Sequence, residues 1–369
     1  FTMAVLDAAV MTDEQWKVAV EATKKDPKIP LPSRLADSPV YGKGLPDQPL
    51  DPVPRGVPGL FAAQLKSPVV GPKESGRLQL AEWLADPKNP LTARVYVNWV
   101  WHHLFGAGIV TTVDNFGLLG ESPSHPELLD DLARRFMSPE MGWSTKKLIR
   151  AIVLSRAWGL DSAADQASYA ADPGNRLFWR FAPQPIEAEA LRDSLLFAGG
   201  KLDFSPLNGS QVAEISKQLP QAQAREIGRR DYYLKDATAD VPYRSVYLPV
   251  ARSAVLDVMT IFDMPDPNLV TGARQSTIVP TQSLFLMNSP LALSASRAAA
   301  ERLLADTPGQ SDLDRIAIAF ERLFGRLPTE EERAAMSEFL TPPDPADPLT
   351  LWAQALQALM VSGEFRTVY

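Results

Sequence analysis

Apolar residues recur at helical spacing along most of this 369-residue chain. Near residue 130, for example, Leu129, Leu132 and Phe136 recur every three or four positions and so share one face of a helix. In the first half of the chain, this spacing predicts a helix of about ten residues from Thr12 and helices at 77–85, 90–105, from Ser124 through Phe136, and from Ser144 through Val153. In the second half, it predicts helices at 185–198, 281–304, 314–324, from Thr329, and at 349–361, with a break at 288–290. We therefore predict a mainly α fold, a packed helical domain with long irregular loops.

One or two short strands complete the predicted elements. The segment YRSVYLPV at 243–250 alternates in polarity and is rich in β-forming residues, which makes it the strongest strand prediction. The segment IVTTV at 109–113 is the second, in the loop after the helix 90–105.

Short motifs mark several of the predicted helix ends. Ser124 with Glu127, and Thr329 with Glu332, have the spacing of a capping box, in which each side chain binds the other residue's backbone N–H. Gly106 follows the helix 90–105, where a left-handed glycine is typical of a helix C-terminus.

Prolines divide the chain, which holds 33 of them against 21 glycines. They are dense between Pro30 and Pro58, where each fixes its own φ and biases the preceding residue to extended geometry. We predict an N-terminal region at 1–72, made of a helix and this proline-rich connector, followed by a helical domain at 73–369. The polar, weakly patterned stretch 201–242 is expected to be a flexible insertion, a loop region or a mobile flap.

The composition excludes several classes of function. Hydrophobic residues make up 45% and charged residues 22% of the chain, as in ordinary globular proteins. With a net charge of −7 and no basic cluster, the chain is not expected to bind nucleic acid. No apolar run approaches the roughly 20 residues of a membrane helix, so no membrane span is expected. The absence of cysteine excludes disulfides, thiolate metal sites and a C-x-x-C-H haem attachment in this chain.

The stretch RVYVNWVWHHLFGAG holds two of the chain's three histidines. Adjacent helical residues point about 100° apart, so His102 and His103 are not expected to hold one ion together. We interpret them as structural, hydrogen-bonding histidines; the alternatives are a polar site and a metal or haem contact. Arg94, Asn98 and His102 share a polar stripe. Because this helix is apolar on most sides, we expect the stripe to hydrogen-bond to the loop 113–125.

The next stretch, VDNFGLLGESPSHPELLDD, carries several carboxylates and a histidine. One interpretation is a turn followed by a helix cap. The other is a general acid–base site, for which Arg94, Asp114 and His125 are the candidate catalytic residues. The acidic residues lack EF-hand spacing, and no second row of ligands follows the histidine pair, so no metal site is predicted.

A third group of polar residues lies among apolar runs between 244 and 290. Its arginines and aspartates are expected either to form Arg–Asp pairs that tie segments together or to line a pocket for an anionic ligand. No G-x-S-x-G elbow, phosphate loop or dinucleotide fingerprint accompanies them, so no cofactor site is predicted. The polar residues are Arg244, Arg252, Asp263, Asp266, Arg274, Thr277, Gln282 and Asn288.

Several blocks of the sequence, taken in order, resemble one known family. They include LAEWLADPKNPLTARVYVNWVWHHLFGAG, GWSTKKLIRAIVLSRAW, PIEAEALRDSLLFAGGKLD, RQSTIVPTQSLFLMNSP and the closing SGEF, and they cover residues 75–366. The family is the planctomycete-type C-terminal domain of unknown function, DUF1553. One departure is Trp99, which stands where the family usually has arginine. The positions that fit the pattern are Asn89, Pro90, Arg94, Asn98, Phe105, Gly106, Asp114, Gly117, His125, Pro126, Glu127, Arg192, Asp193, Arg274, Thr277, Gln282 and Asn288.

The resemblance implies a setting for the chain but no reaction. Family members commonly follow a planctomycete-type cytochrome c domain and look exported, so we expect a non-catalytic scaffold or interaction module of an exported, cytochrome-c-associated multidomain protein. Its location would be periplasmic, cell-surface or extracellular, and its partners other domains or subunits of that assembly. No cofactor is expected in this chain; any c-type haem would belong to a separate domain or partner. Because the sequence starts at Phe1, we expect a portion of a longer product.

The alternative is an extracytoplasmic enzyme. It would be a polysaccharide-acting hydrolase or a redox enzyme, with its site near Arg94, Asp114 and His125. The resemblance carries over no catalytic residue, so this alternative rests on the residues alone.

Overall fold

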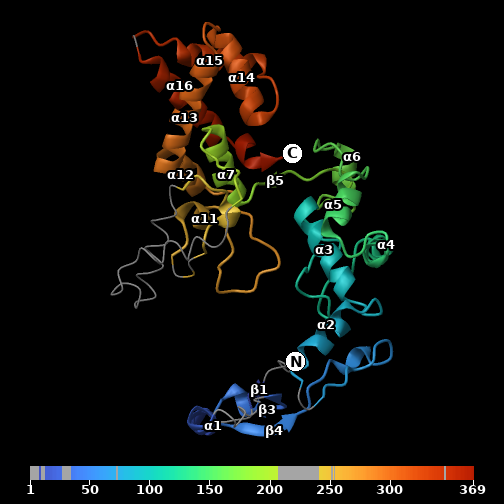
Figure 1. Cartoon of the computed structure of the whole chain (residues 1–369). Coiled ribbons are helices and arrows are strands. Elements are labelled where there is room, and N and C mark those ends of the chain that lie inside the picture. Colours follow the sequence, from blue (N-terminus) through green and yellow to red (C-terminus); the bar gives the residue numbers. More distant parts are fainter. Residues whose placement is uncertain are drawn as a thin grey trace. The chain divides into compact units, whose positions relative to one another are not determined.

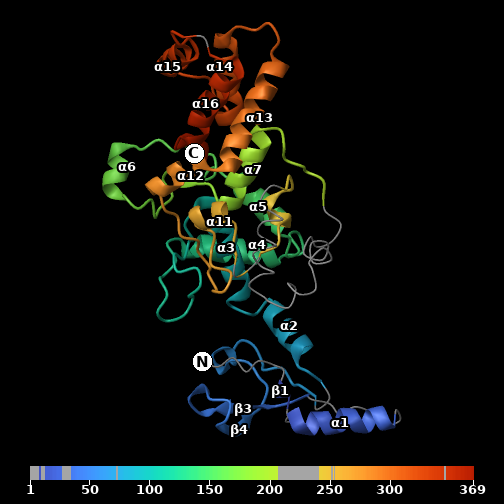
Figure 2. The same ribbon diagram turned by 90° about the vertical axis from the view of Figure 1, so that its left-hand side faces the viewer.

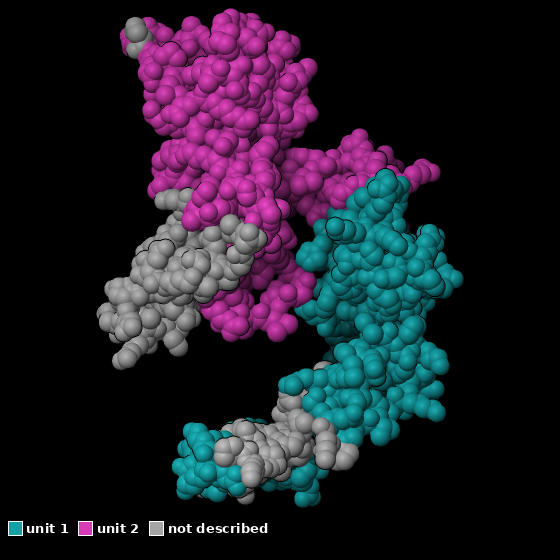
Figure 3. Space-filling view, in the orientation of Figure 1, with its two compact units in different colours: residues 1–155 teal, residues 156–369 magenta. Residues whose placement is uncertain are grey.

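The chain is seen in a computed structural model, which describes residues 8–9, 13–26, 35–71, 74–206, 241–250, 252, 254–344 and 346–369. It divides into two compact units, residues 1–155 and 156–369 (Figure 3). The boundary predicted between 72 and 73 falls inside the first unit and stays a prediction. Most of the insertion predicted at 201–242 lies outside the described residues.

Unit 1 contains two small antiparallel sheets and a group of helices (Figure 1). β1 pairs with β2, and β3 pairs with β4 across an irregular register between Pro39 and Tyr41. Part of the predicted extended connector therefore forms a two-stranded sheet, in which every strand is an edge and proline is tolerated. The elements are β1 (Ala8–Ala9), α1 (Asp13–Lys25), β2 (Leu35–Ala36), β3 (Ser38–Tyr41), η1 (Gly42–Gly44), β4 (Pro49–Val53), η2 (Gly59–Phe61), α2 (Arg77–Ala85), α3 (Thr92–Phe105), α4 (Pro126–Met137) and α5 (Thr145–Val153).

The helix α3 packs against α4 and α5. Val97 on α3, Phe136 on α4 and Leu148 on α5 are all buried. The Tyr96 ring stacks on Phe136 with centroids 5.1 Å apart, and its hydroxyl lies 2.7 Å from Thr145 Oγ1 at the start of α5. The apolar stripe predicted for α4 is therefore the face that this helix buries.

Unit 2 is built almost entirely from helices (Figures 1 and 2). Its one sheet among the described residues pairs β5 with β6, so that Gln184 lies opposite Val368. The elements are α6 (Gln166–Ala171), β5 (Gln184–Pro185), α7 (Ala188–Ala198), η3 (Ser245–Tyr247), α11 (Asp257–Ile261), α12 (Pro280–Asn288), α13 (Pro290–Asp306), α14 (Asp312–Phe324), α15 (Glu330–Leu340), α16 (Pro348–Val361), η4 (Glu364–Arg366) and β6 (Thr367–Val368).

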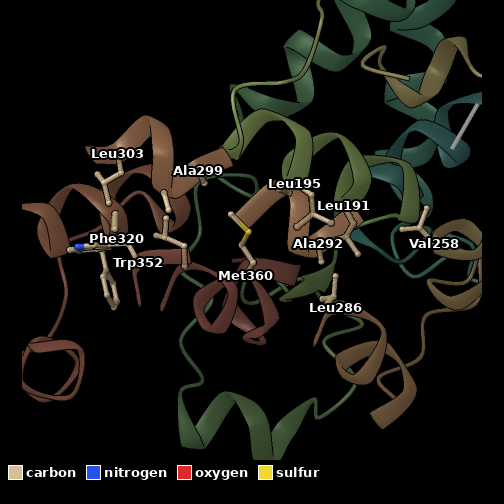
Figure 4. Close-up of a cluster of buried hydrophobic side chains, with 14 of the residues drawn as sticks. Leu191, Leu195, Val258, Leu286, Ala292, Ala299, Leu303, Phe320, Trp352 and Met360 are labelled. Carbon is tan, nitrogen blue, oxygen red and sulfur yellow. The ribbon is translucent and has the colours of Figure 1, made fainter. Parts of the chain in front are cut away.

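The core of unit 2 gathers around α13 and α16 (Figure 4). α13 contributes small buried residues to it, among them Ala292, Ala295 and Ala299. Small side chains let two helix backbones approach closely, and α13 packs along α16 more extensively than any other pair of elements. α16 fills the space beside them with Trp352 and Met360, both almost completely buried.

Several predicted helix ends are confirmed. Ser144 Oγ accepts a hydrogen bond from Lys147 N at the start of α5. Thr329 and Glu332 form the capping box predicted for α15. Ser289 ends α12 and caps α13, which is the break predicted between those helices.

Three local predictions are wrong. His125 occupies the N-cap position of α4 without a side-chain capping bond, and the hydroxyl of Ser124 donates to the Ile109 carbonyl oxygen instead of forming a capping box. No strand forms at 243–250: Ser245–Tyr247 form the short 3₁₀ helix η3, Ser245 binds Asp193 of α7, and Tyr243 makes only an isolated bridge with Asp203. Residues 109–113 form bends and turns and no strand.

The predicted fold class is confirmed: the described residues are mainly helical, and their strands form three two-stranded sheets. Among these residues, no helix combines the length and the apolar character that crossing a bilayer requires.

An arginine in unit 2 joins two carboxylates near the end of the chain. The Arg326 guanidinium donates to both oxygens of Glu332, at 2.8 and 2.7 Å, and to both oxygens of Glu364, each at 2.6 Å. The hydrogen bonds from Arg326 lower the pKa of the Glu332 carboxyl from its ordinary 4.5 to about 2. The fork ties the start of α15 to the turn η4.

This network predicts an acid-dependent loss of stability. A carboxyl with a depressed folded-state pKa stabilises the fold above its unfolded pKa, and that contribution disappears as pH falls from 4.5 towards about 2. As pH falls through this window, we expect the melting temperature of the Arg326→Met variant to fall less than that of the wild type. The control is Arg333→Met, which removes only an exposed pair with Glu330. Equal slopes for wild type and Arg326→Met would contradict the assignment.

Candidate functional site

Arg94, the first candidate catalytic residue, binds a carboxylate on the neighbouring helix. Its Nε donates to Asp130 Oδ1 at 2.6 Å, and its Nη1 donates to the Pro90 carbonyl oxygen, also at 2.6 Å. The hydrogen bond from Arg94 lowers the pKa of the Asp130 carboxyl. The structure therefore places Arg94 as a link between α3 and α4.

The other two candidates lie on the segment between these helices. His125 precedes α4, with its Nδ1 3.0 Å from Ser124 Oγ. Asp114 is exposed in the turn that follows Val113. The ion pair of Arg94 is made with Asp130, and the catalytic role of Arg94, Asp114 and His125 stays a prediction.

Asn98 ties α3 to the loop that follows it. The side chain is completely buried; its Nδ2 donates to Val110 O at 3.0 Å, and its Oδ1 accepts from Val110 N at 2.8 Å. Gly108 permits this approach, because a Cβ there would lie 2.3 Å from Val110 O and 2.9 Å from Asn98 Nδ2. The expected contact of this residue with the loop 113–125 is wrong, since its partner lies three residues earlier. Trp99 reaches that loop instead, donating from Nε1 to Val113 O at 3.1 Å.

The paired histidines occupy different environments. His102 is half-buried and His103 is exposed, and their ring centroids lie 5.6 Å apart at 66° between the planes. Across the described parts of both units, no group of three or more histidine, aspartate or glutamate side chains is placed to hold a metal ion.

Unit 2 contains a cavity of about 970 Å³ between α7, η3 and α11. Its wall is mostly apolar, with Phe197 from α7, Leu248 after η3 and Met259 from α11. Charged side chains interrupt this wall at Glu187, Glu189, Asp193, Arg244 and Arg274.

Arg274 closes one side of the cavity by binding two glutamates. Its Nη1 and Nη2 donate to the two oxygens of Glu189 at 2.6 and 2.9 Å, and its Nε lies 3.3 Å from Glu187 Oε1. Burial alone would raise the pKa of Glu189, but the hydrogen bonds from Arg274 outweigh it and the pKa lies below its ordinary value. Of the two alternatives for the polar residues of 244–290, Arg274 forms a tie between segments, but with glutamates instead of aspartates. Asp263, one of the expected partners, accepts instead from Thr277 N and Oγ1.

Arg192 and Asp193 connect α7 to η3 beside the cavity. Arg192 is completely buried and donates to the carbonyl oxygens of Val241 and Tyr243, at 2.6 and 3.0 Å, and to Ser245 Oγ at 3.3 Å. Asp193 Oδ1 accepts from Ser245 N at 2.8 Å and from Ser245 Oγ at 2.7 Å. These contacts hold η3 against α7.

The sequence interpretation missed Glu189 as part of this site. A signal was present, because Glu189, Asp193 and Phe197 are spaced by four along α7 and so share one helix face. All three line the cavity. The rest of the wall includes residues of η3 and α11, which follow α7 only after the stretch from residue 199 to residue 244, so local spacing alone does not reveal the site.

The sequence model of one family, described as a protein of unknown function (DUF1553, or PSD1), matches residues 76–340. The chain belongs to the DUF1553 family. No curated protein and no solved structure matches the chain. The DUF1553 match runs from α2 through α15, so it includes both the α3–α4 region and the cavity of unit 2.

Many polar residues that fit the DUF1553 pattern bind other parts of the same chain. Asn89 donates from Nδ2 to Trp83 O and accepts at Oδ1 from the backbone N–H groups of Leu91 and Thr92, at the start of α3. Gln282 is buried and donates from Nε2 to the carbonyl oxygens of Ile261 and Thr277. Arg94, Asn98, Arg192, Asp193, Arg274, Thr277 and Asn288 also make such internal contacts.

Proposed function

We propose that this chain is a non-catalytic scaffold or interaction module of an exported, cytochrome-c-associated multidomain protein. The proposal rests on one observation: many of the polar residues that fit the DUF1553 pattern hydrogen-bond to other segments of the same chain. A catalytic acid, base or nucleophile must keep a lone pair or a proton available to the substrate. Asn98 and Arg192, by contrast, direct their polar groups to backbone atoms of the chain while completely buried.

The setting of the module follows from the family resemblance. Members of the family commonly accompany a cytochrome c domain and look exported, which supports a periplasmic, cell-surface or extracellular location. With no cysteine in the chain, a c-type haem would be attached to a separate domain or partner. The other domains or subunits of that assembly are the partners we propose.

A matched pair of arginine variants tests the scaffold role. Arg274→Met leaves the half-buried Glu189 without its bidentate partner, and we expect a loss of about 2 kcal/mol in the free energy of unfolding. Arg244→Met removes an exposed arginine that lines the same cavity, and we expect a change within about 0.5 kcal/mol. Equilibrium urea unfolding measures both.

Two results would contradict the scaffold role. Removal of a residue that ties segments together lowers stability, so an Arg274→Met variant at least as stable as the wild type would show that Arg274 is not such a tie. A Soret band or a stoichiometric metal in the purified chain would place cofactor chemistry in the chain itself.

A further inference from the structure

The cavity of unit 2 has the size and lining of a small-molecule site. Its volume of about 970 Å³ is at the upper end of the range that holds drug-sized ligands. Much of its wall is apolar, including Phe197, Phe204, Leu256 and Met264. Such a wall suits an aromatic or aliphatic body, and the ligand's polar group must then meet one of the charged side chains.

The charged residues of the cavity differ in how far their hydrogen-bonding capacity is used. Both oxygens of Glu189 accept from Arg274, and Glu187 Oε1 lies close to the same guanidinium. Both oxygens of Glu189 are therefore occupied, and Glu187, with its side chain 49% exposed, is more open to solvent than Asp193.

Asp193 is different, because its contacts are confined to one oxygen. Oδ1 accepts two hydrogen bonds from Ser245 and lies 3.6 Å from Arg192 Nη1. In the described part of the chain no donor reaches Oδ2, although a carboxylate oxygen has two lone pairs to offer. The side chain is 20% exposed, so this acceptor is fixed in position, largely shielded from solvent and still accessible from the cavity.

The charge of the lining selects the kind of ligand. Three carboxylates and two guanidinium groups line the cavity among the described residues, and the Arg192 guanidinium lies outside this lining, 3.6 Å from Oδ1 of Asp193. We infer that the cavity binds a small organic amine, with its apolar body against the wall and its protonated amino group donating to Asp193 Oδ2. This inference is independent of the scaffold role, because binding requires no reaction.

Three probes with one body and different head groups test the charge preference: 2-naphthylmethylamine, 2-naphthalenemethanol and 2-naphthoate. Titration calorimetry on the purified chain should show the amine binding at least about tenfold more tightly than the alcohol or the acid. Equal or tighter binding of the alcohol or the acid would overturn the inference, as would no binding of the amine at millimolar concentration.

Variants separate the role of Asp193 from general effects. Asp193→Asn keeps Oδ1 to accept from Ser245 and replaces the open oxygen by a donor, so the preference for the amine should fall to within about twofold. Glu187→Gln, which removes a cavity carboxylate bound to Arg274, should leave the preference intact. Ala190→Trp adds bulk to the cavity lining and should weaken all three probes. An amine preference that survives Asp193→Asn would overturn the assignment.

Discussion

Replacement of Arg192 by methionine is expected to lower the free energy of unfolding of unit 2 by about 3–5 kcal/mol. The guanidinium is completely buried and donates to Val241 O, Tyr243 O and Ser245 Oγ. Methionine fills much of the volume but donates nothing, so these acceptors lose their partner in a place that water does not easily reach. Asp193 also loses the cation 3.6 Å from its Oδ1.

Equilibrium urea unfolding, followed by far-UV circular dichroism, measures this loss. Arg192→Lys is a graded variant: it keeps the charge but cannot reproduce the planar fork that reaches several acceptors, so an intermediate loss is expected. Arg297→Met is the surface control, because Arg297 is 61% exposed and its ion pair with Glu301 is an exposed i,i+4 pair. Equal stability of Arg192→Met and Arg297→Met would refute the structural role of Arg192.

Replacement of Asn98 by leucine is the second large effect, with an expected loss of about 2–4 kcal/mol in unit 1. Leucine has a similar volume but leaves both the N–H and the carbonyl oxygen of Val110 without a partner, and Val110 is only 2% exposed. The close packing of Gly108 against Asn98 leaves the loop little room to adjust.

A graded variant identifies the cause of that loss. Asn98→Gln keeps an amide that can donate and accept but is one methylene longer, so its stability should fall between wild type and Asn98→Leu. The same urea experiment, read on the unfolding transition of unit 1, makes the comparison. A leucine variant that unfolds at the wild-type urea concentration would show that the loop does not depend on Asn98.

The features that were predictable from the sequence act within one or two turns of the chain. Ser144 and Thr329 mark helix starts because a hydroxyl and a backbone N–H three residues later suffice to form the cap. The alternating pattern at 243–250 misleads, because Ser245 binds Asp193 from 52 residues earlier in the sequence. Ser124 likewise has capping spacing, but its hydroxyl binds Ile109, 15 residues away. Local rules fail where a distant partner takes the group on which they depend.

The candidate site follows the same division. The face of α7 that carries Glu189 and Asp193 was readable from spacing alone. The pairing of Arg274 with Glu189 spans 85 residues, and the pairing of Arg94 with Asp130 spans 36. No local pattern specifies either pairing, so both pairs are evident only from the folded structure.

The position of α16 has a consequence for how this family is divided into pieces. The DUF1553 match ends at residue 340, yet Trp352 and Met360, which lie beyond it, belong to the core of unit 2. The segment matched by the DUF1553 family model is therefore shorter than the segment that forms the core of unit 2. A gene fragment cut at the family boundary would leave the alanine-rich face of α13 exposed to water, so expression limits and fusion points should follow the core of unit 2, through the end of α16.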